Sequence, residues 1–479
     1  MDPLLKMSGT GLARAIRTGD VCSVDVVEAH IRHIQSVNPT LNAVVADRFD
    51  AARGEAAEAD RTLAAAGPEA VGPLHGVPCT IKECFQLTGM PQTGGLVSRV
   101  GLRSEADAPA VARLRAAGAI PMGVTNLSEL CMWFESDNKV YGRTANPYNP
   151  RRIVGGSSGG EGAIIGAGGS PFGLGSDVGG SIRMPAFFNG VFGHKGSSGL
   201  VPNTGQFPIA HGEVGRLLST GPLCRRAEDL MPLLRVLAGP DGTDPIAREI
   251  ALGDPASVSI AGMRVLVAEG DSRFRAQPAL LDALRAAAGA LADQGAAVEF
   301  IDEKRFKRAL EMWFSMLGVA NPHPFRADLF GDRPETKLRW EVARWLLGRS
   351  PHTFPAIALC VIERVGDWVS SDLEAMVEQG EALRVELAEL LSGNTVLLFP
   401  PHPTVAPAHR APLLRPLNFV YTALFNAMQL PVTQAPVGLS PEGLPVGVQI
   451  VGADGQDHRT IAVACALEAA LGGWQPPGG

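Results

Sequence analysis

A glycine-rich stretch, Gly155–Gly199, constrains the fold of this chain more than any other feature. It holds 16 of the 56 glycines within 45 of the 479 residues, together with seven serines. Flexible linkers are also rich in glycine, but large apolar residues such as Ile164, Phe172 and Phe187 are interleaved here, and linkers do not carry that much apolar surface. We therefore expect closely packed backbone, in which glycine permits positive φ angles and a close approach to a ligand.

The rest of the chain alternates between short apolar runs and helical periodicity. Four runs rich in β-branched residues are typical of strands that are buried on both faces: 77–81, 120–124, 264–268 and 297–301. Helical spacing is found over 9–66, 108–119 and 279–294. Strands that alternate with helices predict a mostly parallel sheet covered on both faces.

The charge balance excludes several classes of partner. Lys and Arg total 42 against 49 Asp and Glu, so the net charge is −7 and no basic surface is expected that would hold nucleic acid. Charged residues make up 19% and hydrophobic residues 46% of the chain, which excludes a disordered or coiled-coil protein. The partner that remains is a small molecule.

Three further features concern location. The uncharged stretch 416–441 is long enough to span a bilayer, but its Asn, Gln and Pro residues predict a buried helix followed by an extended segment, with no transmembrane span. Asp2 and Lys6 interrupt the apolar core that an export signal would need. Seven scattered cysteines fit reduced thiols, so we expect a cytoplasmic protein.

No cofactor and no metal are expected. The chain lacks a G-x-x-x-x-G-K-[ST] phosphate loop, and Gly173–Gly179 misses the G-x-G-x-x-G dinucleotide fingerprint by one residue. Cys79 and Cys84 are five positions apart, with no second cysteine pair or histidine cluster at ligand spacing. These patterns predict neither a nucleotide site nor a zinc site.

One lysine and two serines are the candidates for covalent catalysis. Lys82 ends an apolar run, and burial there disfavours its charged form, which would make the neutral amine a general base. Ser157 and Ser181 would complete a Ser–Ser–Lys relay. The backbone N–H groups from Asp177 to Ser181 are the kind of donors that an oxyanion hole requires.

A shorter motif offers a different nucleophile. Gly155–Gly159 matches G-x-S-x-G, the nucleophile elbow of α/β-hydrolases, with Ser157 as the nucleophile. An elbow follows a full strand, whereas only Ile153 and Val154 precede the motif here. The assignment of Ser181 as nucleophile is therefore favoured.

Three blocks of sequence resemble the amidase signature family. They are GGSSGGE at 155–161, GSDVGGSIRMPA at 175–186 and FGHK at 192–195. Further segments are similar to the fatty-acid amide hydrolase branch of this family, especially its second type: 76–85, 203–208, 401–407 and 444–449. The resemblance extends over nearly the whole chain. It departs at Lys195-Gly196, where the family usually has Lys-Pro.

The resemblance implies a three-layer α/β/α fold around a large, twisted, mixed sheet. It implies a single amidase signature domain over 1–479, with an N-terminal helical part at 1–66. We expect the catalytic core at 72–240, with the signature at 155–199, and a variable substrate-pocket or lid region at 300–390.

The resemblance also implies a role for each site residue. Lys82 matches the catalytic lysine, Ser181 the nucleophile, and Ser157 the bridging serine, which in the family follows a cis peptide bond, here from Gly156. The implied oxyanion-hole donors are the backbone N–H groups of Val178, Gly179, Gly180 and Ser181. The implied supporting positions, which hold hydrogen bonds around the site, are Ser158, Asp177 and Arg183.

The substrate implied by the resemblance is a hydrophobic acyl or aryl amide, cleaved to an acid plus an amine or ammonia. The family places acyl-pocket residues at the positions of Cys131, Met132, Trp133 and Phe134, for which core packing is the alternative. Apolar residues at helical spacing between Phe306 and Leu317 predict a core-facing helix. A lid over the acyl channel and a membrane-surface helix are the alternatives for 300–345.

Two other functions remain open from the sequence. The family includes glutaminase-type amidotransferase subunits, which act only with partner chains, and the same fold could also serve as a catalytically silent scaffold. An intact Lys82, Ser157 and Ser181 argues against the scaffold. A stand-alone enzyme is compatible with a homodimer.

Overall fold

An 11-stranded sheet organises the protein, whose computed structural model describes residues 1–271, 273–321, 323–331, 334–366 and 373–478. Its strands are β1 (Val44–Asp47), β2 (Pro78–Lys82), β3 (Ile120–Thr125), β6 (Phe172–Asp177), β7 (Phe192–Lys195), β8 (Ser219–Cys224), β9 (Arg264–Val267), β10 (Ala297–Phe300), β11 (Thr395–Phe399), β12 (Val432–Leu439) and β13 (Pro445–Val451). Their order across the sheet is β1-β3-β2-β6-β8-β7-β12-β13-β11-β9-β10. The short strands β4 (Asp137–Asn138) and β5 (Gly142–Arg143) form a separate pair.

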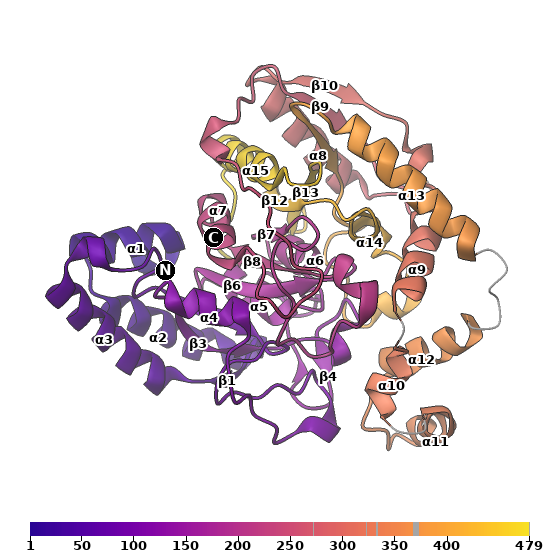
Figure 1. The fold of residues 1–479 in the computed structure, drawn as a ribbon, viewed down its shortest axis with the longest axis horizontal. Helices are drawn as coiled ribbons and strands as arrows, with labels where there is room; N and C mark the ends of the chain where they lie inside the picture. The colour runs from indigo at the N-terminus through magenta and orange to yellow at the C-terminus, as the bar shows by residue number, and fades with distance from the viewer. Residues whose placement is uncertain (272, 322, 332–333, 367–372, 479) are drawn as a thin grey trace.

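Helices cover both faces of this sheet and produce the expected three layers (Figure 1). They are α1 (Gly9–Thr18), α2 (Ser23–Leu41), α3 (Phe49–Ala66), α4 (Pro109–Ala116), α5 (Gly159–Gly166), α6 (Arg183–Phe188), α7 (Leu230–Leu237), α8 (Pro278–Ala292), α9 (Ala309–Ala320), α10 (Phe325–Phe330), α11 (Pro334–Leu346), α12 (Phe354–Gly366), α13 (Leu373–Leu390), α14 (Val420–Ala427) and α15 (Asp457–Leu471). In the described ranges, none of these helices is both long and apolar enough to cross a membrane.

Side-chain alternation explains why both faces must be covered. In β11, Val396 and Leu398 belong to the apolar cluster that contains residues of α8 and α15. Leu397 and Phe399 belong instead to the cluster formed with α9, α13 and α14. Because successive side chains of a strand point to opposite faces, a continuously apolar strand is stable only between two helical layers.

The strand pairing corrects the expectation of a mostly parallel sheet. β2 is parallel to β3 and β6 at one end of the sheet, and β9 is parallel to β10 and β11 at the other. Every pairing from β6 through β8, β7, β12 and β13 to β11 is antiparallel. Antiparallel neighbours need no crossover helix, so the alternation of strands and helices cannot reveal these central pairings. The mixed sheet implied by the family resemblance is confirmed.

The expected elements outside the centre are mostly found close to their predicted bounds. The stretch 416–441 forms the buried helix α14 followed by β12, as predicted. The N-terminal part differs, because β1 interrupts the helices of residues 1–66 and pairs antiparallel with β3. Four residues with helical segments on either side carry too weak a period-two pattern to be recognised as a strand.

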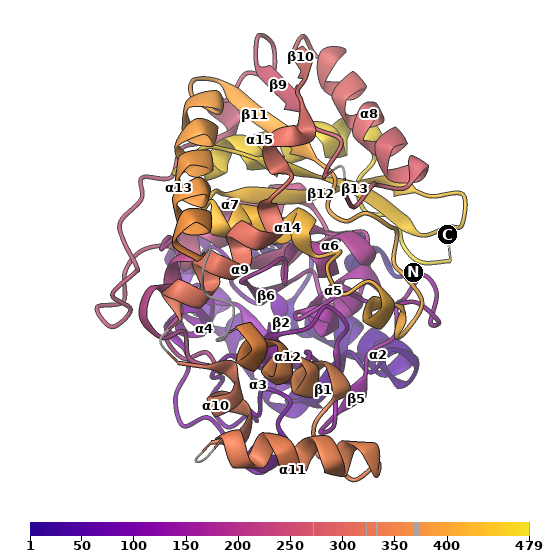
Figure 2. The same ribbon diagram turned by 90° about the vertical axis from the view of Figure 1, so that its right-hand side faces the viewer.

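The region 300–390 divides into two parts. Phe306, Leu310 and Trp313 are buried against the sheet, which confirms the core-facing interpretation of the helix around α9. Figure 2 shows α10, α11 and α12 together, away from the sheet and below α9. The outer surface of α11 exposes Trp340 and Leu346.

Candidate active site

Lys82 lies at the carboxyl end of β2 with its side chain fully buried. Its Nζ is 2.7 Å from Ser157 Oγ and 3.0 Å from Ser176 Oγ, and both contacts are hydrogen bonds. β2 pairs with β6, the strand that carries Ser176, so the sheet itself brings these two residues together. The sequence analysis missed Ser176, because the parallel pairing of β2 with β6 is not visible in the sequence.

The backbone around Ser157 has the conformation that the family resemblance implies. The Gly156–Ser157 peptide bond is cis. A Cβ atom at Gly156 would overlap the carbonyl oxygen of Trp133, so no larger residue fits at this position. Ser136 Oγ donates to the carbonyl of Gly155 at 3.0 Å and ties this turn to the neighbouring loop.

Ser181 lies in the turn that connects β6 to α6, beside Ser157 and Ser158. The N–H of Ser158 donates to the Ser181 carbonyl at 3.2 Å, and Ser158 Oγ donates to the carbonyl of Ser176 at 3.3 Å. Among the described residues, no protein group is hydrogen-bonded to Ser181 Oγ, and that includes Ser157 Oγ. The structure therefore joins Lys82 to Ser157 directly and leaves the Ser181 hydroxyl uncommitted.

The backbone N–H groups of the same turn differ in their availability. The N–H of Gly180 donates to Asp177 Oδ1 at 2.7 Å, so it is not free to bind an oxyanion in this structure. The N–H groups of Val178, Gly179 and Ser181 have no protein acceptor within the described part of the chain. Three of the four expected donors are thus available.

The Asp177–Arg183 ion pair holds this turn in place. Both side chains are fully buried, with Arg183 Nη2 3.0 Å from Asp177 Oδ1 and Nε 3.0 Å from Oδ2. The Asp177 carboxylate also accepts hydrogen bonds from the N–H of Ile182 and from Asn426 Nδ2. Arg183 Nη1 donates to Gln449 Oε1 at 2.8 Å. The network thereby connects the turn to α14 and β13.

This network determines the protonation state of Asp177. Burial alone would raise the pKa of a carboxyl group, but the Arg183 guanidinium outweighs it and holds the pKa of Asp177 well below its usual range. Asp177 is consequently ionised throughout the physiological pH range. The charge of Arg183 is neutralised in the same place, as a buried cation requires.

Two buried acids lie close to Lys82 without forming an ion pair with it. Glu161, in the first turn of α5, accepts hydrogen bonds from the hydroxyls of Thr80 at 2.7 Å and Thr125 at 2.8 Å, and burial raises its pKa to about 8. Burial also raises the pKa of Glu83, to about 7; its carboxylate bonds Thr93, Gly94 and Tyr141. The side-chain partners of Lys82 are therefore two neutral hydroxyls.

The four residues expected in an acyl pocket lie next to Ser157, but they differ in exposure. Phe134 is buried, as core packing predicts, whereas Cys131, Met132 and Trp133 are partly exposed. A hydrogen bond with Cys84 lowers the pKa of Cys131, and the charge of Lys82 acts in the same direction. The Cys131 thiol therefore belongs to the immediate surroundings of the lysine.

An aromatic group formed by Trp133, Phe134, Trp313 and Phe419 continues from these residues to the turn of Ser181. The ring centroids of Trp133 and Phe134 are 4.7 Å apart, and those of Trp313 and Phe419 are 5.0 Å apart. Trp313 Nε1 donates to the Val178 carbonyl at 3.1 Å. The region 300–390 thus contributes a side chain directly to the site, which the sequence alone does not reveal.

Replacing Asp177 by Asn tests the ion pair. The variant leaves the charge of Arg183 buried and unbalanced, so we expect a loss of about 3–5 kcal/mol in the free energy of unfolding at pH 7, measured by urea denaturation. Because folding lowers the pKa of Asp177, its contribution is complete above the ordinary carboxyl pKa and is lost as the pH falls below it. The wild type should therefore lose more stability than Asp177→Asn between pH 6 and pH 3.

Asp50→Asn is the matched control, since the Asp50 side chain is 99% exposed and should change stability by less than about 0.5 kcal/mol. An Asp177→Asn variant as stable as the wild type at pH 7 would contradict the assigned role of the pair.

Comparison with known proteins identifies the family. The amidase family model matches residues 25–461. Fatty-acid amide hydrolase 2-B of Danio rerio is 46% identical, covering 100% of this chain and 92% of its own length, and fatty-acid amide hydrolase 2 of Homo sapiens is 44% identical, covering 100% and 91%. The solved structure of 6-aminohexanoate cyclic dimer hydrolase superposes with a TM-score of 0.82 at 27% identity, over 100% of this chain and 99% of that chain. The chain belongs to the amidase signature family and is an amide hydrolase, an enzyme that breaks a C–N bond.

Proposed function

We propose that the protein is a serine amidohydrolase in which Ser181 is the nucleophile, Ser157 the bridging group and Lys82 the general base. The observation that carries this proposal is the 2.7 Å contact between Lys82 Nζ and Ser157 Oγ, in a setting without an ion-pair partner for the lysine. When Lys82 is neutral, Ser157 can donate its proton to Nζ across this contact, while Nζ still donates to Ser176. Burial of Lys82 favours that neutral form.

The proposed reaction begins with attack of Ser181 Oγ on the amide carbonyl carbon. The Ser181 proton passes to Ser157 as the Ser157 proton passes to Lys82, and the negative carbonyl oxygen accepts hydrogen bonds from the free N–H groups of Val178, Gly179 and Ser181. Collapse of the tetrahedral intermediate breaks the C–N bond, and the leaving nitrogen takes a proton returned from Lys82 through Ser157. Water then attacks the acyl group on Ser181 and releases the acid by the same proton route.

We propose a hydrophobic acyl amide as the substrate. The aromatic group of Trp133, Phe134, Trp313 and Phe419 lies beside the Ser181 turn and offers apolar surface near the reacting carbonyl. The names of the relatives at 44% and 46% identity refer to fatty-acid amides, which supports the same class. These relatives match the full chain, which favours a stand-alone enzyme over a glutaminase subunit.

The remaining parts of the proposal concern organisation and location. We propose one amidase signature domain with its catalytic core at 72–240 and a variable region at 300–390 that contributes Trp313 to the site. All seven cysteines are free thiols, which supports a cytoplasmic location.

Single substitutions test the triad. Ser181→Ala and Lys82→Ala should abolish turnover, because they remove the nucleophile and the base; loss of a general base alone is expected to cost about 10²–10⁴-fold in kcat. Ser157→Ala should retain a little activity, since a water molecule can replace the bridging hydroxyl. The measurement is acid release under saturating amide.

Ser170→Ala is the matched control, because Ser170 lies in the same glycine-rich segment and only bonds the Phe172 carbonyl. It should keep near-normal turnover. A fully active Ser181→Ala together with an inactive Ser157→Ala would overturn the proposal in favour of the elbow assignment.

A panel of amides tests the substrate class. Acyl length and amine group are varied separately, from acetamide to long-chain amides and anilides, with glutamine included. Each buried methylene contributes about 0.8 kcal/mol, so kcat/KM should rise about fourfold per added CH₂ until the apolar surface is filled. A preference for glutamine or for the shortest acyl group would contradict the assigned class.

A further inference from the structure

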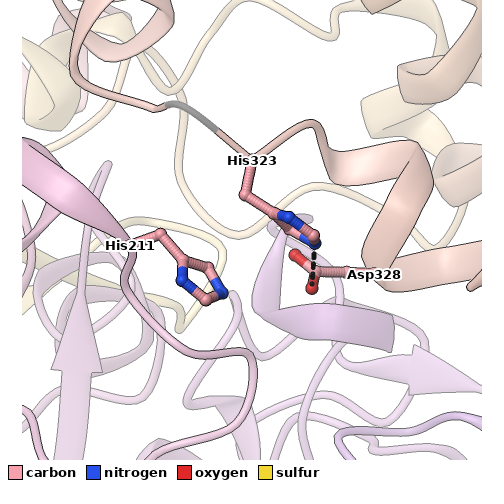
Figure 3. A group of neighbouring side chains, drawn as sticks. All are labelled: His211, His323 and Asp328. Atoms are coloured by element: carbon pink, nitrogen blue, oxygen red, sulfur yellow. Dashed lines mark ion pairs between the residues drawn. The ribbon is translucent and has the colours of Figure 1, made fainter.

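Two histidines and an aspartate meet at a place that the amide hydrolase mechanism does not use. His211 directly precedes the 3₁₀ turn η5 (Gly212–Arg216), whereas His323 and Asp328 belong to the segment that follows α9 and to α10. The candidate ligand atoms of the three residues all lie within 4.8 Å of one another. Figure 3 shows both imidazole rings and the carboxylate directed toward a common space.

We propose that His211, His323 and Asp328 bind one divalent transition-metal ion of the zinc type. Imidazole nitrogen and carboxylate oxygen are established ligands of Zn²⁺, and three protein ligands leave a fourth position for water. His323 Nε2 and Asp328 Oδ1 are already 3.4 Å apart, close to the separation of about 3.3 Å that two ligands at 2.0–2.1 Å from a tetrahedral ion have.

The third ligand is within reach of the other two. The ring centroids of His211 and His323 are 4.8 Å apart with an angle of 43° between the ring planes. All three side chains are partly exposed, so an ion has access and the rings have room to turn. Among the described residues, no protein group is hydrogen-bonded to the His211 side chain, so binding an ion would not require breaking such a bond.

The charges around the group favour a cation. Burial raises the pKa of Asp328, and the two histidines act against this rise, which places them in electrostatic contact with the carboxylate. Glu363 adds a second negative charge nearby, and it is held by the N–H of Phe325 at 2.7 Å and by Arg326 at 3.1 Å. Glu363 is thus an outer carboxylate, and Asp328 is the one available as a ligand.

An ion at this place would fasten the segment after α9 to the core. The turn that follows His211 packs on the apolar cluster of α9 through Val214. α9 in turn carries Trp313, which donates to the Val178 carbonyl in the Ser181 turn. The bound ion would therefore join two segments that flank the site, 112 positions apart in sequence. That separation is the reason why ligand spacing in the sequence predicted no metal.

Titration of the full-length, chelator-treated protein with Zn²⁺ and with Co²⁺ tests the site. We expect one equivalent per chain by calorimetry, a visible Co²⁺ absorption of nitrogen- and oxygen-bound metal, and a Tm that rises with Zn²⁺. His323→Ala, Asp328→Asn and His211→Ala should each weaken binding at least tenfold, and lowering the pH from 7 to 5 should release the ion as the imidazoles gain protons.

His458→Ala is the matched control, because this partly exposed histidine of α15 lies outside the group and should leave binding unchanged. Binding that survives all three variants but disappears on thiol blocking would assign the ion to cysteines and overturn the proposal. The absence of any saturable binding by the wild type would overturn it as well. Neither outcome depends on amidase activity, so the test is independent of the proposed reaction.

Discussion

The buried ion pair between Asp177 and Arg183 is the interaction on which the rest of the site depends. Two charges removed from water are stable only if each remaining donor and acceptor is used, and here backbone N–H groups, Asn426 and Gln449 complete the set. Because these partners come from α14 and β13, the turn of Ser181 can adopt its conformation only when distant parts of the chain have folded around it. The same pair engages the N–H of Gly180 and so selects which backbone donors remain free.

The chemistry around Lys82 follows from what the fold excludes. A buried ammonium would need a carboxylate, but the two nearest acids are held by hydroxyls and amides of their own, and burial raises the pKa of both. The lysine is left with two serine hydroxyls, one of which leads toward Ser181. The close packing of the glycine-rich segment makes this arrangement possible: a Cβ atom at Gly173 would overlap the Glu161 carboxylate, and every residue of 155–199 except Val178 is buried. The segment is rigid structure, as its apolar content predicted.

The sequence predicts the outer strands, the buried helix and strand within 416–441, and the conformation around Ser157, because each rests on local patterns or on motifs. It does not predict the antiparallel centre of the sheet, the strand β1, or the roles of Ser176 and Trp313, since these arise from pairings between distant segments. Gly180 shows the same limit at the level of one atom. A motif can place its N–H in an oxyanion hole, but only the folded Asp177 side chain shows that this N–H already has an acceptor.

The identity of the nucleophile is the central claim, and covalent labelling tests it most directly. A fluorophosphonate probe reacts with an activated serine, and digestion followed by mass spectrometry locates the adduct. We predict a single adduct on Ser181 in the wild type, and none there in Lys82→Ala on the same time scale. An adduct on Ser157, or a protein that hydrolyses amides while Ser181 stays unlabelled, would contradict this account.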